Sequence, residues 1–119
     1  MKLRTTEADT QRAILQYLAL KKIWHRRFNV GAARLPGKGG RERLVQFGAP
    51  GLPDIMARTT RSIIWIEVKS SVGTQSDAQR AWQEDAEAFG DTYILARKVE
   101  DVMALFEPAT GKAKAGAEA

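Results

Sequence analysis

The sequence contains no cysteine among its 119 residues and a single histidine, His25. Disulfide bonds and thiolate metal sites are therefore excluded, and one histidine cannot form a histidine-based metal cluster. No apolar run approaches the roughly 20 residues that span a bilayer, and the polar start of the chain shows no signal-peptide pattern. From these absences we expect a cytoplasmic protein with no membrane segment.

Length and composition fit one folded domain. Hydrophobic residues make up 44% of the chain, which is typical of globular proteins. Basic residues are concentrated in the first part: residues 1–50 carry 11 Lys and Arg against three Asp and Glu, whereas residues 51–119 carry eight against 11. This asymmetry suits a polyanionic partner, but a solvated surface with an accidental imbalance would give the same pattern.

Hydrophobic spacing predicts a mixed sheet with helices packed on it. Thr59 to Arg61 suits a hairpin turn between two strands, and Ser76 with Gln79 suits a helix capping box. The predicted order is α-β-β-β-α-β-α, with helices over residues 6–23, 76–89 and 99–106 and strands over residues 25–30, 54–58, 62–69 and 92–96.

Residues 31–50 are interpreted as a long loop, because they hold five glycines and two prolines. Loops of this length are usually functional or mobile, so this basic segment is either a phosphate contact or a solvated flexible stretch. Residues 1–107 are predicted to form the domain. Residues 108–119 are rich in Ala, Gly and Lys and are predicted to be a disordered C-terminal tail.

The strongest predicted strand ends in charged residues. Side chains alternate along a strand, so Trp65, Glu67 and Lys69 share one face, and a carboxylate emerges beside an ammonium group. Burying either charge without a partner is unfavourable. If this strand and the preceding one form a hairpin, Asp54 lies opposite Glu67, because both are equally far from the turn.

Two converging carboxylates indicate a divalent cation, because like charges repel unless a cation lies between them. Mg²⁺ or Mn²⁺ takes one or two carboxylates plus water and leaves room for phosphate. Held by Asp54 and Glu67, it would activate water toward a phosphodiester, and Lys69 would position that water or neutralise the phosphate. Taken singly, Asp54 could be a turn residue after Pro53, and Glu67 with Lys69 a surface ion pair.

These residues resemble the signature of a known superfamily. Pro53-Asp54, followed thirteen positions later by Glu67-Val68-Lys69, resembles the PD-(D/E)XK nucleases. Glu7 in the first helix, Arg-Phe-Asn-Val-Gly at 27–31, Gly-Leu at 51–52 and Gln79 extend the pattern. The order is similar to that of the VRR-NUC family, the virus-type replication-repair nuclease module, over about residues 5–97.

The resemblance implies a restriction-endonuclease-like α/β core and a metal-dependent endodeoxyribonuclease. Its expected substrate is branched or structured DNA, such as a Holliday junction or flap, and its expected state is a homodimer in a bacterial or phage-infected cell. Asp54 and Glu67, with the backbone carbonyl of Val68, would bind the metal, and Lys69 would be the catalytic lysine. Glu7 and Gln79 would complete the site, although Glu7 could instead complement a helix dipole and Gln79 could serve only in the capping box.

Six basic residues are predicted to hold the DNA backbone: Arg26, Arg27, Arg34, Lys38, Arg41 and Arg43. His25 is interpreted as a strand-edge residue, and Trp24, Trp65 and Trp82 as core residues. Two other functions stay open. One is a non-catalytic DNA-binding module that retains the nuclease fold. The other is a basic RNA-binding protein, which the absence of an RNP-type aromatic motif disfavours.

Overall fold

The computed structural model describes residues 5–28 and 31–107, except for the side chains of residues 31–34 and 44–47. The predicted C-terminal tail and the last two residues of the predicted strand 25–30 lie outside the described residues. The fold is mixed α/β, as the sequence predicts. Its elements are α1 (Glu7–Leu20), β1 (Trp24–Arg27), β2 (Gly31–Pro36), the 3₁₀ turn η1 (Lys38–Gly40), β3 (Glu42–Phe47), β4 (Ile55–Arg58), β5 (Ile63–Val68), α2 (Asp77–Ala88), β6 (Thr92–Ala96) and α3 (Val99–Phe106).

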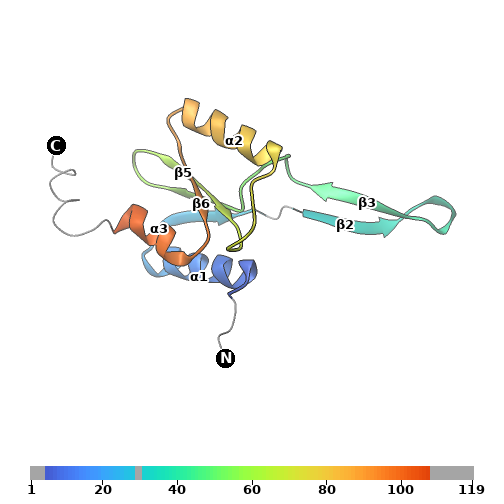
Figure 1. Cartoon of the computed structure of the whole chain (residues 1–119), viewed down its shortest axis with the longest axis horizontal. Coiled ribbons are helices and arrows are strands. Elements are labelled where there is room, and N and C mark those ends of the chain that lie inside the picture. The colour runs from blue at the N-terminus through green and yellow to red at the C-terminus, as the bar shows by residue number, and fades with distance from the viewer. Residues whose placement is uncertain (1–4, 29–30, 108–119) are drawn as a thin grey trace.

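A four-stranded sheet in the order β1-β4-β5-β6 forms the centre of the molecule. The pairs β1–β4 and β4–β5 are antiparallel, and β5–β6 is parallel. Helices α1 and α3 cover one face of this sheet and α2 lies over the other, so the body has three layers (Figure 1). None of the helices in the described residues has the length and apolar character needed to cross a membrane.

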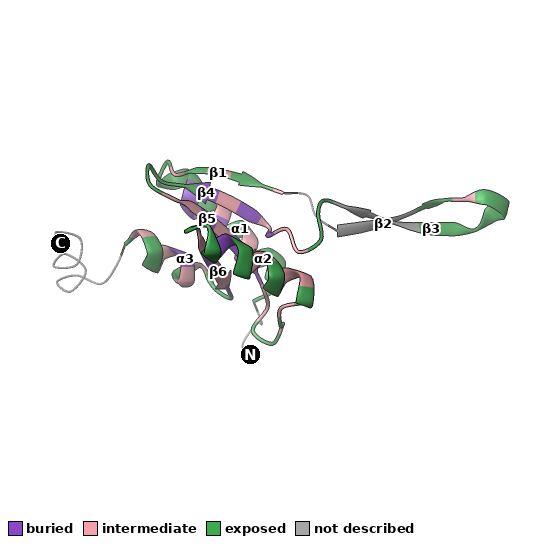
Figure 2. Cartoon of the chain, turned by 90° about the horizontal axis from the view of Figure 1, so that it is seen from above, coloured by how far each residue is buried: buried purple, intermediate pink, exposed green. Residues whose placement is uncertain are grey.

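The main core lies between the sheet and the pair α1 and α3. Ile66 and Val68 of β5 are completely buried there against Ile14 and Leu18 of α1 and Val102 of α3. Buried residues gather in the body, whereas the turn at the end of the β2–β3 pair is exposed (Figure 2). The alternation predicted for β5 is therefore confirmed, because its apolar face meets the two helices.

The opposite face of the sheet packs on α2 through aromatic residues. Trp65 of β5 meets Trp82 of α2 edge-on, with ring centroids 5.3 Å apart, and its Nε1 donates to Asp91 Oδ2 at 3.0 Å. Trp24, in contrast, is 43% exposed and lies beneath the guanidinium of Arg26, 4.5 Å from the ring centroid. The interpretation of Trp24 as a core residue is wrong. Trp24 is the first residue of β1, which is an edge strand and pairs with a neighbouring strand on one side.

Helix α1 ends three residues earlier than the sequence predicts. Thr6 caps its start in a capping box with Asp9. At its end Lys22 takes a left-handed conformation with φ of 57°. Ile23 N then donates to Leu18 O at 2.9 Å, and Lys22 N donates to Ala19 O at 3.1 Å. This is the Schellman pattern that usually has glycine at the left-handed position, so the stop carries no glycine signal in the sequence.

The prediction of a loop over residues 31–50 is wrong. β2 and β3 form an antiparallel hairpin from the pair Gly31–Phe47 to the pair Pro36–Glu42. Three of the five glycines that indicated a loop lie in its turn, where Gly39 and Gly40 have φ of 68° and 77° and Gly37 N donates to Arg41 O at 2.7 Å. The hairpin is a sheet of its own and projects from the body (Figure 1), so the element order holds two strands more than predicted.

Candidate active site

The register of β4 and β5 brings Asp54 to the end of β5. Ile55 pairs with Ile66, as the predicted hairpin requires, so the position before Ile55 lies beside Glu67. Asp54 Oδ2 accepts a hydrogen bond from Val68 N at 2.8 Å, and the Asp54 carbonyl accepts one from Phe28 N at 2.8 Å. Asp54 is therefore fixed between the ends of β1 and β5.

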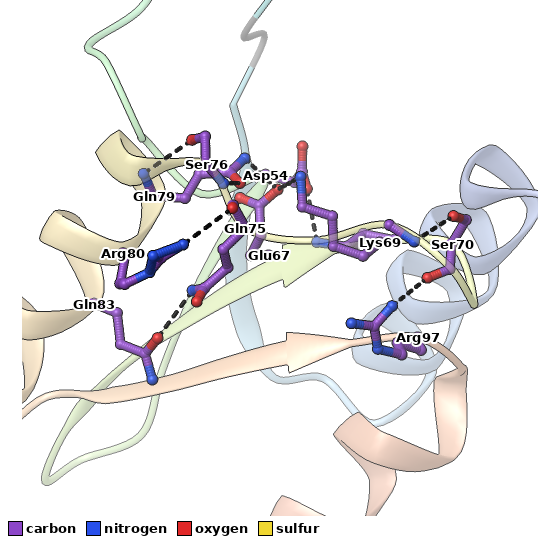
Figure 3. A network of polar contacts seen from close by, with 12 residues as sticks. Asp54, Glu67, Lys69, Ser70, Gln75, Ser76, Gln79, Arg80, Gln83 and Arg97 are labelled. Carbon is purple, nitrogen blue, oxygen red and sulfur yellow. Dashed lines mark hydrogen bonds and ion pairs between the residues drawn. The ribbon is translucent and has the colours of Figure 1, made fainter.

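Glu67 is the buried charged residue of the sheet, with 3% of its surface exposed. Its Oε2 accepts a hydrogen bond from Gln79 Nε2 at 2.9 Å and lies 3.6 Å from Lys69 Nζ (Figure 3). Its Oε1 is buried and has no hydrogen-bond partner. In the charged form of Glu67 this buried acceptor is destabilising, whereas protonated Glu67 can hydrogen-bond to the Asp54 carboxylate, which contributes to its raised pKa.

The electrostatics of the site favour an additional positive charge. Burial, together with the nearby Asp54 carboxylate, raises the pKa of Glu67 to about 8, and Lys69 opposes this shift. The same two carboxylates add to the effect of burial in raising the pKa of Tyr93. One ammonium group thus does not compensate both acids, and a cation beside Glu67 Oε1 would do so.

Three groups could supply oxygen ligands to such a cation. Glu67 Oε1 has no protein partner, and one carboxylate oxygen of Asp54 is left over from the bond to Val68 N. The N–H and C=O of one strand residue point to the same side, so the Val68 carbonyl is expected on the side of Asp54. Among the residues described, no group of three or more His, Asp or Glu gathers into a metal site. The set suits Mg²⁺ or Mn²⁺, which fill their remaining positions with water or phosphate.

Gln79 joins the start of α2 to the carboxylate. Its side-chain Oε1 accepts from Ser76 N at 2.9 Å, while its backbone N donates to Ser76 Oγ at 3.1 Å, which is the predicted capping box. The amide group on the same side chain donates to Glu67, so one residue caps the helix and contacts the site. The two interpretations of Gln79 are compatible.

A close backbone contact fixes the Asp54 loop against α2. Gly51 has φ of 78°, and a Cβ atom placed on it would lie 2.2 Å from the carbonyl oxygen of Ala78 in the first turn of α2. Only glycine allows both the backbone conformation and the contact. The loop that delivers Asp54 and the helix that delivers Gln79 are therefore packed directly on each other.

Glu7 makes no direct polar contact with the charged residues of this site in the part of the chain that the structure describes. Glu7 is exposed in the first turn of α1, and within the described ranges it has no hydrogen bond or ion pair with Asp54, Glu67 or Lys69. The capping box of α1 uses Asp9 instead. The geometry fits the alternative in which Glu7 complements the helix dipole.

The basic residues predicted to bind DNA fall into two groups. Arg26 and Arg27 are exposed on β1, and Arg27 pairs with Ile55 next to Asp54.

His25 between Trp24 and Arg26 is half-buried, with Nδ1 2.7 Å from Ile23 O, as expected for a strand residue.

The second group lies at the far end of the hairpin. Lys38 belongs to the turn, and Arg41 and Arg43 follow it; all three are exposed. The side chain of Arg34 lies outside the described residues.

Two features near the site were missed in the sequence. Arg97 donates to the Ser70 carbonyl at 2.6 Å and so holds the loop that follows Lys69 (Figure 3). Gln75 donates to Tyr93 Oη at 3.2 Å and to Gln83 Oε1 at 2.9 Å, which ties the same loop to β6 and α2. A signal for Arg97 was present: it directly follows β6, and the carboxyl ends of parallel strands share one edge, where ligands bind.

No protein-family model, curated protein or solved structure matches the chain.

Proposed function

We propose that the protein is a divalent-metal-dependent endodeoxyribonuclease that hydrolyses phosphodiester bonds in branched or structured DNA. The observation that carries the proposal is Glu67 Oε1, an acceptor buried without a partner beside Asp54 and Lys69. Stability alone does not favour such an arrangement, and strain of this kind is expected at functional sites. A cation would satisfy the oxygen and balance the two carboxylates.

The arrangement of elements supports the resemblance to PD-(D/E)XK nucleases of the VRR-NUC type. Asp54 precedes one strand of an antiparallel hairpin, and Glu67, Val68 and Lys69 end the other. A helix carrying Gln79 then leads to a parallel strand. We propose that this is a restriction-endonuclease-like core. A homodimer in the cytoplasm is part of the same proposal, because so small a chain covers little DNA by itself.

In this proposal each residue has a separate task. Asp54, Glu67 and the Val68 carbonyl hold Mg²⁺ or Mn²⁺, which when bound supplies Lewis-acid charge and lowers the pKa of water. Gln79 donates to Glu67 Oε2, which would leave Oε1 available as a ligand for the cation. Lys69 places its ammonium group against the negative charge that develops on the phosphate as water attacks phosphorus and the ester bond breaks.

The basic side chains would bind the substrate through its backbone. Arg27 pairs with Ile55 next to Asp54, where it can contact phosphates close to the cleaved bond, whereas the Arg26 guanidinium lies over Trp24 further along β1. Contacts to phosphates position DNA without reading its sequence. The proposed enzyme therefore recognises the shape of its substrate and has no strict base preference.

Replacement of Lys69 tests the proposal. Lys69→Ala should reduce cleavage of labelled duplex, flap and four-way DNA in Mg²⁺ or Mn²⁺ by about 100-fold or more, while DNA binding persists. Lys21→Ala is the matched control, because Lys21 is exposed and, among the described residues, its ion pair is with Glu107. If wild type and Lys69→Ala both bind these DNAs and neither cuts any of them, the protein is a non-catalytic DNA-binding module instead.

A further inference from the structure

The β2–β3 hairpin, called here the arm (residues 31–47), forms a two-stranded sheet of its own. In the part of the chain that the structure describes, its two strands pair only with each other. A two-stranded hairpin is at best marginally stable alone in water. A six-pair ladder that stands away from the body is therefore suited to contact another molecule (Figure 1).

The arm begins at the candidate active site. Phe28, three residues before β2, donates its N–H to the Asp54 carbonyl at 2.8 Å. Arg27 pairs with Ile55, so the chain leaves the sheet for the arm and returns from it at the end where Asp54 lies. Each strand of the arm has six residues, and at about 3.4 Å per residue the arm reaches about 20 Å from its base.

The charges at the end of the arm indicate what kind of molecule it contacts. Lys38, Arg41 and Arg43 are all exposed there, with Glu42 as the one acid among them. Such a positive end attracts a polyanion, whereas the ends of two arms would repel each other. Phosphates of nucleic acid fit this chemistry, since Lys and Arg supply most of the affinity for the backbone.

We propose that the arm measures duplex length on one side of the cleaved bond. This inference rests on the proposed nuclease function. Base pairs are stacked 3.4 Å apart, so an arm of about 20 Å that lies along the duplex spans about six base pairs from its base, which adjoins the active site. A branch of the substrate shorter than that ends before Lys38 and Arg41 and loses their contacts.

The test compares Lys38→Ala/Arg41→Ala with Arg58→Ala/Arg61→Ala. The control pair removes two exposed charges at the opposite end of the sheet, beside the β4–β5 turn. Arg43 is kept so that each double variant removes two positive charges. Binding is measured on branched DNA with one arm shortened through about 12, 9, 6 and 3 base pairs, over a range of salt, with Ca²⁺ replacing Mg²⁺ so that the DNA is not cut.

Wild type and the control pair should bind more weakly once the duplex falls below about six base pairs. Lys38→Ala/Arg41→Ala should lose this length dependence, and its slope of log affinity against log salt should be smaller by about two, one for each lost phosphate contact. An unchanged slope and length dependence in that variant would overturn the proposal. So would a shift from dimer to monomer with an unchanged slope, because the arm would then be an interface between copies.

Failure of the arm and failure of the nuclease are separable. A wild type that cuts DNA, while both double variants bind alike at every duplex length, overturns the arm alone. A wild type that shows the length dependence but cuts no DNA in Mg²⁺ or Mn²⁺ overturns the hydrolytic role and leaves the arm in place. Absence of any DNA binding overturns the arm.

Discussion

Glu67 is at once a core residue and an acid. Its position in β5 faces α2 beneath the Asp54 loop, where an apolar side chain would avoid the unsatisfied Oε1. Residues that reduce stability in this way are typical of sites where binding compensates them. Glu67 should therefore reduce the stability of the metal-free protein, and binding of a cation should restore that stability.

Glu67→Gln should remove a pH dependence of stability. The folded-state pKa of about 8 lies above the ordinary value of 4.5, so the folded protein holds this proton more tightly than the unfolded chain. The stabilising contribution is complete below the lower value and is lost as the pH rises through the higher one. In EDTA, thermal unfolding should show Glu67→Gln melting above wild type at about pH 9, with the difference shrinking toward about pH 5.

Two comparisons check this result. Glu84→Gln, at an exposed position of α2, should melt like wild type at both pH values. Saturating Mg²⁺ should raise the melting temperature of wild type and leave that of Glu67→Gln nearly unchanged. A difference between Glu67→Gln and wild type that stays constant from pH 5 to pH 9 would contradict the raised pKa.

Gln79→Ala and Ser76→Ala should separate the two tasks of Gln79. Each substitution breaks the capping box of α2 and should destabilise the protein by about 1 kcal/mol in urea unfolding. Only Gln79→Ala also removes the donor to Glu67 Oε2. Metal titrations of cleavage should therefore show a weaker response for Gln79→Ala and a wild-type response for Ser76→Ala. An equal response of the two variants to metal would show that Gln79 acts only as a helix cap.

Among the elements, the loop before β4 and helix α2 depend on one glycine contact. Gly51→Ala should destabilise the protein by about 3 kcal/mol or more, because it combines a left-handed backbone with a severe overlap against Ala78. Gly90→Ala is the matched control, with φ of 87° and no atom within 4 Å of the added Cβ. It should cost only about 1 kcal/mol. Equal losses in urea unfolding would show that the overlap is relieved by movement of the loop.

Some elements were readable from the sequence because their signals are local. The β4–β5 register follows from the short turn after Thr59 and from apolar strands on both sides of it. The stop of α1 was not readable, because Lys22 takes a conformation that glycine usually signals. The arm was not readable either: Gly-Ala-Ala-Arg-Leu-Pro has low strand propensity, and its pairing partner determines its structure.

For the whole molecule, the sequence predicted which charged residues lie together but not which of their polar atoms have hydrogen-bond partners. Asp54, Glu67 and Lys69 gather as alternation and register require. The unpartnered Oε1 and the contact of Gly51 with α2 depend on tertiary packing, which no spacing rule describes. Glu7 shares a helical face with the buried Ile14 but is itself exposed, so helical spacing alone did not predict its burial.

The hydrogen bond between Phe28 N and the Asp54 carbonyl separates the length of the arm from the geometry of the active site. It closes a loop of 25 residues, 29–53, at the margin of the sheet. Doubling the length of such a loop costs only about 0.6 kcal/mol of closure entropy. The body can therefore keep one active-site geometry while the closed segment is lengthened, shortened or exchanged over evolution. The length of the arm can then change without a change in the proposed reaction.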